Sequence, residues 1–291
     1  MTNAAGPRPH VQGGHPALDV LIPTRDRPNA LAVTLTSLLA QQWSPMHVVV
    51  SDQGDEAALE TSPTLGAALR VLASYGLEVE VLRHLPRRGM AEQRQFLLDH
   101  AAGPYALALD DDVILGPGLV PRMMGAILEQ GCGFVGSAVI GLSHATDVRP
   151  DEEAIDWWEG PVRPEIVRPG SKEWARHRLH NAANLWHLQR SLGISPDRQR
   201  LYRVAWVGGC VLWDVTALRE AGGFSFWQRL PPEHAGEDVL AQLRVMATRG
   251  GCAVLPSEAY HLELPTKVVD RTVDAPWVLD AGTKPVPERT S

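Results

Sequence analysis

Tyr105-Ala-Leu-Ala-Leu-Asp110-Asp111-Asp112-Val113 is the stretch that decides the fold. Its apolar run is typical of a buried strand, and the strand ends abruptly on three carboxylates. Three neighbouring acids repel one another and are costly to desolvate, so a divalent cation explains them best, and ligands that are all oxygen favour Mg2+ or Mn2+. Such a cation in turn binds phosphate. Taken alone, the stretch also fits an acidic turn in contact with water.

Strand and helix signals alternate along the chain on both sides of this stretch. The predicted strands are residues 18–22, 46–50, 78–82, 105–109 and 134–140, and the predicted helices begin at Pro28, span residues 89–101 and lie around residues 120–129. Strands separated by helices imply an α/β fold with a largely parallel sheet and helices on both faces. Ligands of such sheets bind beyond the carboxyl ends of the strands, and Asp52 and the three acids both fall there.

Length and composition fit a folded enzyme of one elaborated domain, or of a domain with a subdomain. Of the 291 residues 44% are apolar, which is ample for a core, and the net charge of -7 argues against a general nucleic-acid binder. The three cysteines, Cys132, Cys210 and Cys252, are far apart and form no Cys-x-x-Cys pair. They therefore suggest neither a zinc site nor a disulfide framework, and a reducing compartment fits best.

Residues 1–16 are rich in Gly, Pro and His and contain no apolar core, so we expect a flexible tail and not a signal peptide. No stretch approaches the roughly 20 apolar residues of a membrane span. We therefore expect a cytoplasmic protein, with peripheral membrane association left open.

Several further motifs follow one another in a fixed order. They are Leu21-Ile-Pro-Thr-Arg25, Val50-Ser-Asp52, Gly89-Met-Ala-Glu-Gln-Arg94, Asp110-Asp111-Asp112, Val207-Gly-Gly-Cys-Val-Leu-Trp213, Gly222-Gly-Phe224 and Gly236-Glu-Asp238-Val-Leu240. In this order the chain resembles nucleotide-sugar glycosyltransferases with the GT-A fold, in particular family 2, over approximately residues 18–264. The combination is far more specific than any single motif.

The resemblance implies a Rossmann-like, mostly parallel sheet flanked by helices, with an acceptor-side subdomain. We expect a tail at 1–16, a nucleotide-sugar-binding half at 17–140, an acceptor-binding and catalytic half with a variable insertion at 141–264, and a closing loop and tail at 265–291.

The same resemblance assigns the nucleotide-sugar site. It implies that Pro23, Thr24, Arg25, Asp52, Arg94, Asp110 and Asp111 contact the donor, with Asp52 against the nucleobase. A UDP-sugar is the default donor because Asp52 could accept a hydrogen bond from the imide nitrogen of uracil, although guanosine and thymidine also offer an N-H there. The motif departs from the family after Arg94, where Gln95 and Leu97 replace the usual Asn and Gly.

Metal binding is expected at Asp112, Asp110 and His261. A divalent cation can act as a Lewis acid on the charge that develops on the leaving phosphate. Asp112 is the expected direct ligand, and Asp110 helps through water or reaches the ribose. Asp111 points to the other side of an extended chain and could instead be structural. The family often supplies a late ligand, for which His261 stands at a plausible place after the apolar run 252–255.

Glu237 and Asp238 open a helical pattern, where acids commonly stabilise the positive end of the helix dipole. The family instead uses an acid of this pair, usually the second, as general base toward the acceptor hydroxyl. The resemblance therefore implies an inverting transfer with Asp238 as base, while Glu237 orients the acceptor or the loop.

Gly208 and Gly209 fall in the Val207–Trp213 motif, which the resemblance places in the acceptor half, and Trp206 stands directly before it; we expect all three at the acceptor. The region 142–203 varies most in the family and is rich in Trp and His. Its tryptophans could stack on sugars, but packing in a core is the more frequent use of a large aromatic side chain. His177, His180 and His187 could align on one helical face, yet no carboxylate completes a metal site.

Two alternatives come from other functional classes. One is a non-catalytic binding module that retains the nucleotide-sugar fold. The other is a phosphohydrolase with an aspartate nucleophile, which also places Asp-x-Asp after a strand. Such a hydrolase would have Thr or Val where Ile114 stands, and it would not explain Gly236-Glu-Asp238.

Overall fold

The computed structural model describes residues 15–55, 58–268 and 270–280. Most of the predicted tail at 1–16 and the end of the C-terminal segment lie outside these ranges. Within them, no helix combines the length and the apolar character needed to cross a membrane.

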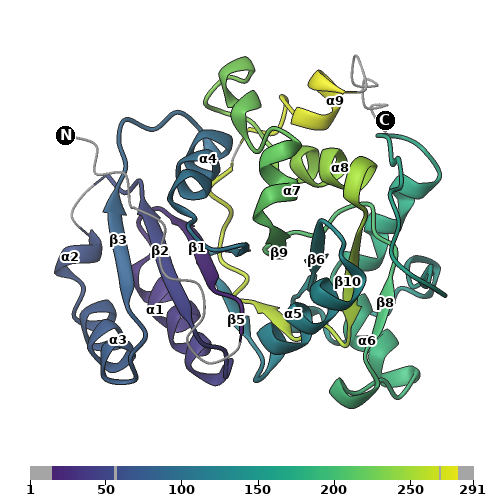
Figure 1. Ribbon diagram of the computed structural model, residues 1–291, viewed down its shortest axis with the longest axis horizontal. Coiled ribbons are helices and arrows are strands. Elements are labelled where there is room, and N and C mark those ends of the chain that lie inside the picture. Colours follow the sequence, from purple (N-terminus) through teal and green to yellow (C-terminus); the bar gives the residue numbers. More distant parts are fainter. Residues whose placement is uncertain (1–14, 56–57, 269, 281–291) are drawn as a thin grey trace.

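A large mixed sheet forms the centre of the molecule (Figure 1). In the described ranges its strand order is β3-β2-β1-β4-β9-β6-β10-β8. Their bounds are β1 Leu18–Thr24, β2 Met46–Asp52, β3 Val79–Arg83, β4 Tyr105–Leu109, β6 Phe134–Gly136, β8 Arg200–Tyr202, β9 Cys210–Asp214 and β10 Gly251–Leu255. Strands β1 to β4 run parallel, whereas β9 is antiparallel to both β4 and β6. The predicted strands at 18–22, 46–50, 78–82 and 105–109 are thereby confirmed.

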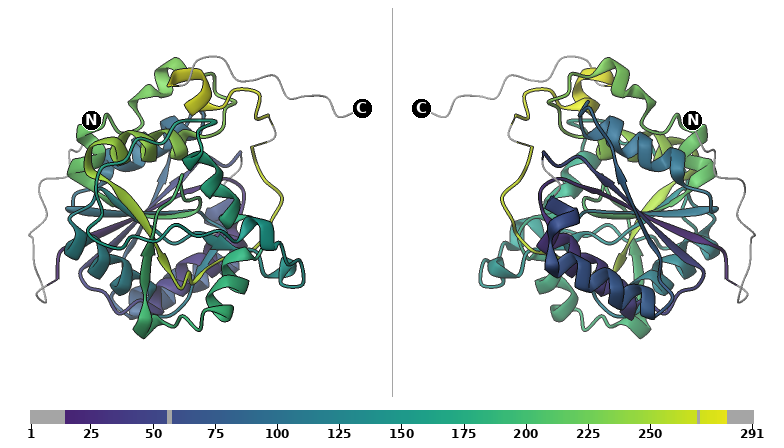
Figure 2. Two further views of the ribbon diagram at one scale, coloured as in Figure 1. Left: turned by 90° about the vertical axis from the view of Figure 1, so that its right-hand side faces the viewer. Right: turned by 90° about the vertical axis from the view of Figure 1, so that its left-hand side faces the viewer.

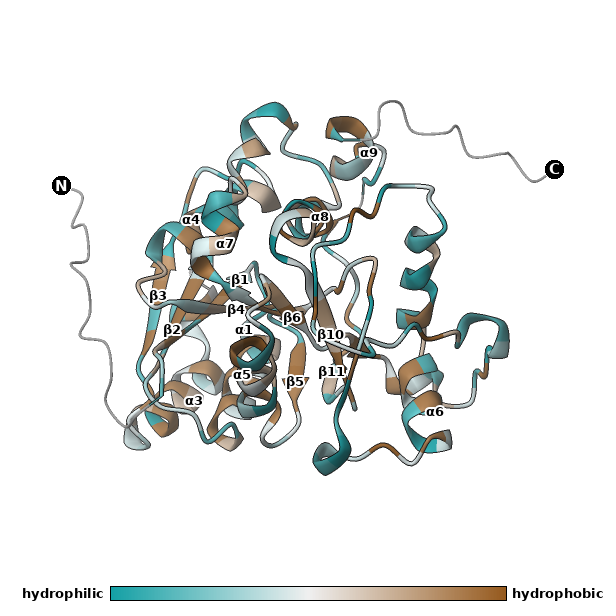
Figure 3. Ribbon diagram, turned by 45° about the vertical axis from the view of Figure 1, so that its right-hand side comes forward, coloured by the Kyte–Doolittle hydropathy of each residue, from teal (hydrophilic) through white to brown (hydrophobic). Residues whose placement is uncertain are grey.

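Helices cover both faces of this sheet (Figure 2). The helices are α1 Pro28–Ser37, α2 Ala58–Thr61, α3 Pro63–Ser74, α4 Met90–His100, α5 Leu119–Gln130, α6 Asn184–Ser191, α7 Val215–Glu220, α8 Glu237–Arg249 and α9 Ala275–Leu279. Successive side chains of β1 point to opposite faces of the sheet, and the hydrophobic core has one part on each face. Leu21 belongs to the part that includes residues of α4, α7 and α8. Val20 and Ile22 belong to the part that includes residues of α1, α3 and α5. The strands are accordingly hydrophobic in Figure 3, while many connecting loops are hydrophilic.

The predicted single strand at 134–140 is wrong, because two sheets share this segment. Strand β6 ends at Gly136, and β7 Val139–Ile140 belongs to a small sheet with β5 Val113–Leu115 and β11 Ala259–His261. Between them the buried Ser137 donates its backbone N-H to the Cys210 carbonyl over 3.0 Å, and its hydroxyl lies 2.9 Å from that of Ser257. These hydrogen bonds satisfy the backbone where the chain passes from one sheet to the other.

The region 142–203 contains α6 and short 3-10 helices at Leu142–His144, Pro150–Glu152, Glu173–His180 and Pro196–Arg198. His177 and His180 lie on the third of these and His187 on α6, so the three histidines do not share one helical face. The chain turns at Asn181 between the two helices and separates the histidines.

Two tryptophans of this region pack under arginines, with the guanidinium carbon of Arg200 3.8 Å from the ring centroid of Trp157 and that of Arg203 3.7 Å from Trp158. Cation-π packing gives these two side chains a structural use.

Candidate active site

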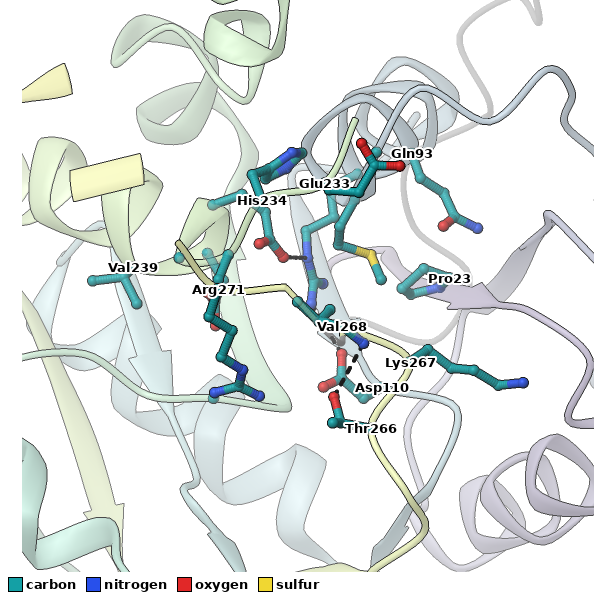
Figure 4. A pocket seen from close by; sticks show the side chains of 18 of the residues that line it. Pro23, Gln93, Asp110, Glu233, His234, Val239, Thr266, Lys267, Val268 and Arg271 are labelled. Atoms are coloured by element: carbon teal, nitrogen blue, oxygen red, sulfur yellow. Dashed lines mark hydrogen bonds and ion pairs between the residues drawn. The ribbon is translucent and has the colours of Figure 1, made fainter. Parts of the chain in front are cut away.

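A cavity of about 1140 Å3 opens at the carboxyl ends of β1 and β4. Figure 4 shows side chains from distant parts of the chain around it, with Pro23 and Gln93 on one side, Val239 on the other and Val268 between them in this view. The lining brings together twelve of the residues predicted from the sequence: Pro23, Thr24, Arg25, Arg94, Asp110, Asp111, Asp112, Trp206, Gly208, Glu237, Asp238 and His261. Asp52 and Gly209 are not among the residues that line it.

The three consecutive acids have three different environments. The Asp110 side chain is 37% exposed and accepts a hydrogen bond from Arg94, whereas Asp111 and Asp112 are buried. Thr24 donates its hydroxyl to Asp111 Oδ2 over 2.6 Å, and the Thr34 hydroxyl donates to the Asp111 carbonyl over 2.9 Å. Burial raises the pKa of Asp111 to about 6, against the opposing effect of the Thr24 hydrogen bond. Asp111 is thus tied to β1 and α1.

Arg27, which sequence analysis did not single out, contacts two of these acids. Its Nη1 donates to Asp111 Oδ1 over 3.2 Å and to Asp112 Oδ2 over 2.8 Å. Arg27 stands immediately before the first turn of α1, which aims its side chain at the end of β4. A sequence with three adjacent acids indicates that positive charge is needed, but it does not show which of several arginines supplies it.

His261 completes the surroundings of Asp112, with its Nε2 3.4 Å from Asp112 Oδ2. Burial works against the charged form of Asp112, but His261 and Arg27 hold its pKa below the ordinary value, and Asp112 in turn raises the pKa of His261. The other ring nitrogen, Nδ1, accepts the backbone N-H of Glu263 over 3.0 Å. The neutral ring therefore carries its proton on Nε2 and donates toward Asp112.

Asp112 and His261 suit a divalent cation in spacing and chemistry. Two neighbouring ligands of an octahedral ion at about 2.1 Å lie roughly 3 Å apart, close to the separation of Asp112 Oδ2 and His261 Nε2. In the described part of the chain, no group of three or more His, Cys, Asp or Glu side chains is placed to hold a metal. Mg2+ commonly uses one or two carboxylates and takes its other ligands from water and substrate phosphates, so the residues fit such an ion.

Arg94 of α4 links the acids Asp110–Asp112 to the acid pair Glu237 and Asp238. Its Nη2 donates to Asp110 Oδ1 and its Nε donates to Glu237 Oε1, both over 3.0 Å. Burial favours the neutral form of a guanidinium, but Asp110, Glu237 and Asp238 raise the pKa of Arg94 above its ordinary value. Arg94 therefore stays charged and holds Glu237 in place.

Asp238 follows at the second position of α8 and lines the cavity. Burial and the negative charge of Glu237 raise its pKa to about 7, against the opposing charge of Arg94. A carboxylate poised near neutral pH can accept a proton from a hydroxyl group.

The segment before β9, residues 206–208, is hydrogen-bonded to helix α8. The buried Gln242 of α8 accepts the Val207 backbone N-H over 2.7 Å and donates to the Val207 carbonyl over 2.8 Å. The Gln242 amide also donates to the Asp238 carbonyl over 3.2 Å, so these bonds tie Val207, between Trp206 and Gly208, to the first turn of α8.

Three tryptophans from different segments, Trp174, Trp206 and Trp277, line this side of the cavity. The ring centroids of Trp174 and Trp206 are 4.4 Å apart, and His177 stacks on Trp206 at 4.7 Å. Trp277 meets Trp174 edge-on at 6.0 Å. Sequence reasoning missed Trp277 because it lies in the C-terminal segment that was expected to be a closing loop and tail.

At the opposite end, Asp52 is buried and its carboxylate already has partners. It accepts from Arg83 Nη1 over 3.0 Å and from the Gly54 backbone N-H over 2.8 Å. Its neighbour Gln53 reaches the cavity. The predicted contact of Asp52 with a nucleobase stays a prediction.

Comparison with known proteins defines the class of this molecule. Residues 19–184 match the model of glycosyl transferase family 2, and the chain belongs to that family. The pre-mycofactocin glycosyltransferases of two Mycobacterium tuberculosis strains are each 25% identical to it over 236 residues, or 81% of this chain. The chain spans only 40% of the length of these relatives.

A solved structure shows the same fold. The crystal structure of residues 1–349 of S. aureus TarS in complex with UDP-GlcNAc superposes with a TM-score of 0.51 at 14% identity, covering 86% of this chain and 60% of that one. The predicted GT-A fold, with its mixed sheet between layers of helices, is confirmed.

Proposed function

We propose that this protein is an inverting glycosyltransferase that moves a sugar from a nucleotide-diphosphate donor to an acceptor hydroxyl. The observation that carries the proposal is the position of Asp238, a carboxylate with a pKa near 7 in the same cavity as the Asp110–Asp112 acids. Family membership supports it, as does the pre-mycofactocin glycosyltransferase, whose name describes the same kind of reaction.

The donor occupies the end of the cavity formed by β1 and the start of α4. Pro23, Thr24, Arg25, Arg94, Asp110 and Asp111 line this end. Asp52 does not line it, and its carboxylate accepts the Gly54 backbone N-H next to Gln53, which does. A UDP-sugar remains the default, and the UDP-GlcNAc bound to TarS is a precedent for it in this fold.

Asp112 and His261 would hold Mn2+ or Mg2+, with Asp110 reaching the ion through water. The ion would supply Lewis-acid stabilisation of the charge on the leaving diphosphate. For His261 to bind it through Nε2, the ring proton must move to Nδ1 and the Glu263 N-H must turn away, since Nδ1 now accepts from that group.

The acceptor enters along Trp174, Trp206 and Trp277, with Trp206 and Gly208 beside its hydroxyl. Gly209 does not line the cavity and would act only through the backbone that it shares with Gly208. Asp238 takes the hydroxyl proton, the hydroxyl oxygen bonds to the anomeric carbon, and the bond from that carbon to the diphosphate oxygen breaks on the opposite face. One such displacement inverts the configuration. Glu237 stays paired with Arg94 and keeps Asp238 oriented.

A screen of nucleotide sugars tests this function. The purified protein is incubated with Mn2+ and UDP-, GDP- or dTDP-sugars together with simple hydroxyl acceptors, and the products are followed by mass spectrometry. A glycosylated acceptor is the expected product, and proton NMR of its anomeric signal should show inverted configuration. Nucleotide binding without sugar transfer or donor hydrolysis would instead identify a binding module. Release of phosphate from a phosphomonoester would favour the phosphohydrolase.

A further inference from the structure

The guanidinium of Arg27 uses the same carboxylate oxygen that the proposed metal would use. Asp112 Oδ2 lies 2.8 Å from Arg27 Nη1 and 3.4 Å from His261 Nε2. The side chains of Arg27 and Asp112 are only 14% and 7% exposed, so water screens this ion pair weakly. A divalent ion that binds Asp112 must therefore compete with Arg27.

Arg27 and His261 also hold the segment that follows β11. Arg27 Nη2 donates to the Pro265 carbonyl, and the Glu263 backbone N-H donates to His261 Nδ1. Arg27 and His261, the two side chains next to Asp112, thus both contact the backbone of residues 263–265.

Residues 264 and 265 begin a longer part of the chain, the described residues 264–268 and 270–277, which we call the strap, and we call residues 264 and 265 its root. Of the strap, Leu264, Thr266, Lys267, Val268, Asp270, Arg271, Asp274, Pro276 and Trp277 line the cavity. The far end of the strap is fastened separately. There the Ala235 N-H donates to the Val273 carbonyl over 2.9 Å, and the Ala275 N-H donates to the Ala235 carbonyl over 2.8 Å. A change at the root would move the wall of the cavity while its far end stays anchored.

We propose that Arg27 is a positioning residue that neutralises Asp111 and Asp112 and fastens the strap through Pro265, and that a divalent ion on Asp112 displaces it. Metal loading then releases the root of the strap. The inference rests on the metal site of the proposed function and adds a residue and a motion that the metal site alone does not require.

Metal affinity distinguishes this role from a merely structural one. If Arg27 competes with the ion, Arg27→Gln removes the competitor, and the protein should bind Mn2+ about tenfold more tightly without nucleotide. If Arg27 only shapes the site, its loss should weaken Mn2+ binding. Arg27→Lys keeps the charge and should stay close to the parent affinity.

Arg25→Gln is the matched control, because it removes the same charge from the same cavity. Arg25 pairs with Asp26 and Asp55 and not with the acid cluster. Mn2+ affinity is measured by the electron paramagnetic resonance of free Mn2+, after the melting temperature has shown that each variant is folded. If Arg25→Gln and Arg27→Gln raised the Mn2+ affinity equally, the loss of one positive charge from the cavity would explain both gains, and the proposal would be overturned.

Hydrogen exchange of the strap is the second measurement. In the parent protein, Mn2+ should speed exchange of the backbone N-H groups of Leu264, Thr266, Lys267 and Val268 several-fold, since Pro265 has none. In Arg27→Gln, exchange of these groups should already be fast and should not respond to Mn2+. Unchanged or weaker Mn2+ binding in Arg27→Gln, or a strap that ignores Mn2+ in the parent, would overturn the proposal. Failure of the parent to bind Mn2+ would reject the metal site itself, which separates the two failures.

Discussion

Arg94 donates from Nε to Oε1 of Glu237 over 3.0 Å, and this pairing separates the roles of two adjacent acids. Glu237 is committed to a permanently charged partner. Asp238, the next residue, has a pKa of about 7 because burial and the charge of Glu237 oppose its ionisation. Because this pKa lies near neutral pH, Asp238 is suited to exchange protons.

Replacement of Asp238 by Asn should separate binding from chemistry. The amide keeps nearly the same shape but cannot accept the acceptor proton, so transfer should fall by about 10^2-fold or more while donor affinity changes little. If Asp238 only stabilised the start of α8 through its charge in the first turn, Asn would cost some stability, but turnover of the folded protein would stay. The measurements are steady-state transfer and nucleotide titration on the same folded sample. Near-normal turnover would remove Asp238 from the mechanism.

The pH profile should follow the ionisation of the same group. Since burial raises the pKa of Asp238, the carboxylate is protonated below about pH 7 and ionised above it, and only the ionised form accepts a proton. We therefore expect kcat/KM to rise with pH through a midpoint near 7 and to level off about one pH unit above it. Glu237→Gln removes the neighbouring negative charge that raises this pKa, so the midpoint should move to lower pH. If the midpoint did not move, the pH dependence of kcat/KM would come from a group other than Asp238.

Removal of the metal ligands should affect nucleotide binding only when metal is present. Asp112→Ala should abolish the Mn2+-dependent part of nucleoside diphosphate binding and leave the fold intact, because it removes a cavity ligand and not an apolar core contact. His261→Ala should weaken Mn2+ more than it weakens the nucleotide alone.

Calorimetric titration of UDP with and without Mn2+ gives both effects. Asp151→Ala changes an exposed acid outside the cavity lining and serves as the control. A folded Asp112→Ala protein with parent affinity would contradict the assignment of the ligand.

Local pattern was enough to predict strands β1 to β4. The apolar runs of β1, β2 and β4 end in polar residues, and parallel strands bring these ends together, so Thr24, Asp110 and Asp111 could be expected near one another. The ordered motifs also brought Asp238 to the same cavity, although it is distant in sequence.

Contacts that depend on tertiary packing could not be predicted in this way. Arg27 looks like any other charged residue before a helix, and its pairing with Asp112 appears only once β4 and α1 are assembled. The division of residues 134–140 between two sheets depends on Cys210 and Ser257, which no local pattern connects to Ser137. Trp277 reaches the cavity only because the strap is anchored at Ala235.

The last prediction concerns the turn that starts α4 and so positions Arg94. Gly89 has a φ of 102°, and a Cβ there would lie 2.5 Å from His234 Cε1 and 2.6 Å from the Pro232 carbonyl oxygen. The buried His234 cannot easily move, because its Nδ1 lies 2.7 Å from the Pro231 carbonyl and its Nε2 accepts the Ala91 N-H over 3.1 Å.

Gly89→Ala should therefore lower the free energy of unfolding by about 3 kcal/mol, from backbone strain together with steric overlap. Gly118→Ala is the matched control, because Gly118 also has a positive φ, of 72°, and also precedes a helix, but a Cβ there would have nothing within 4 Å. It should cost only about 1 kcal/mol, from strain alone. Urea denaturation of the two variants measures the difference. Equal losses would show that the contact between Gly89 and His234 does not constrain the start of α4.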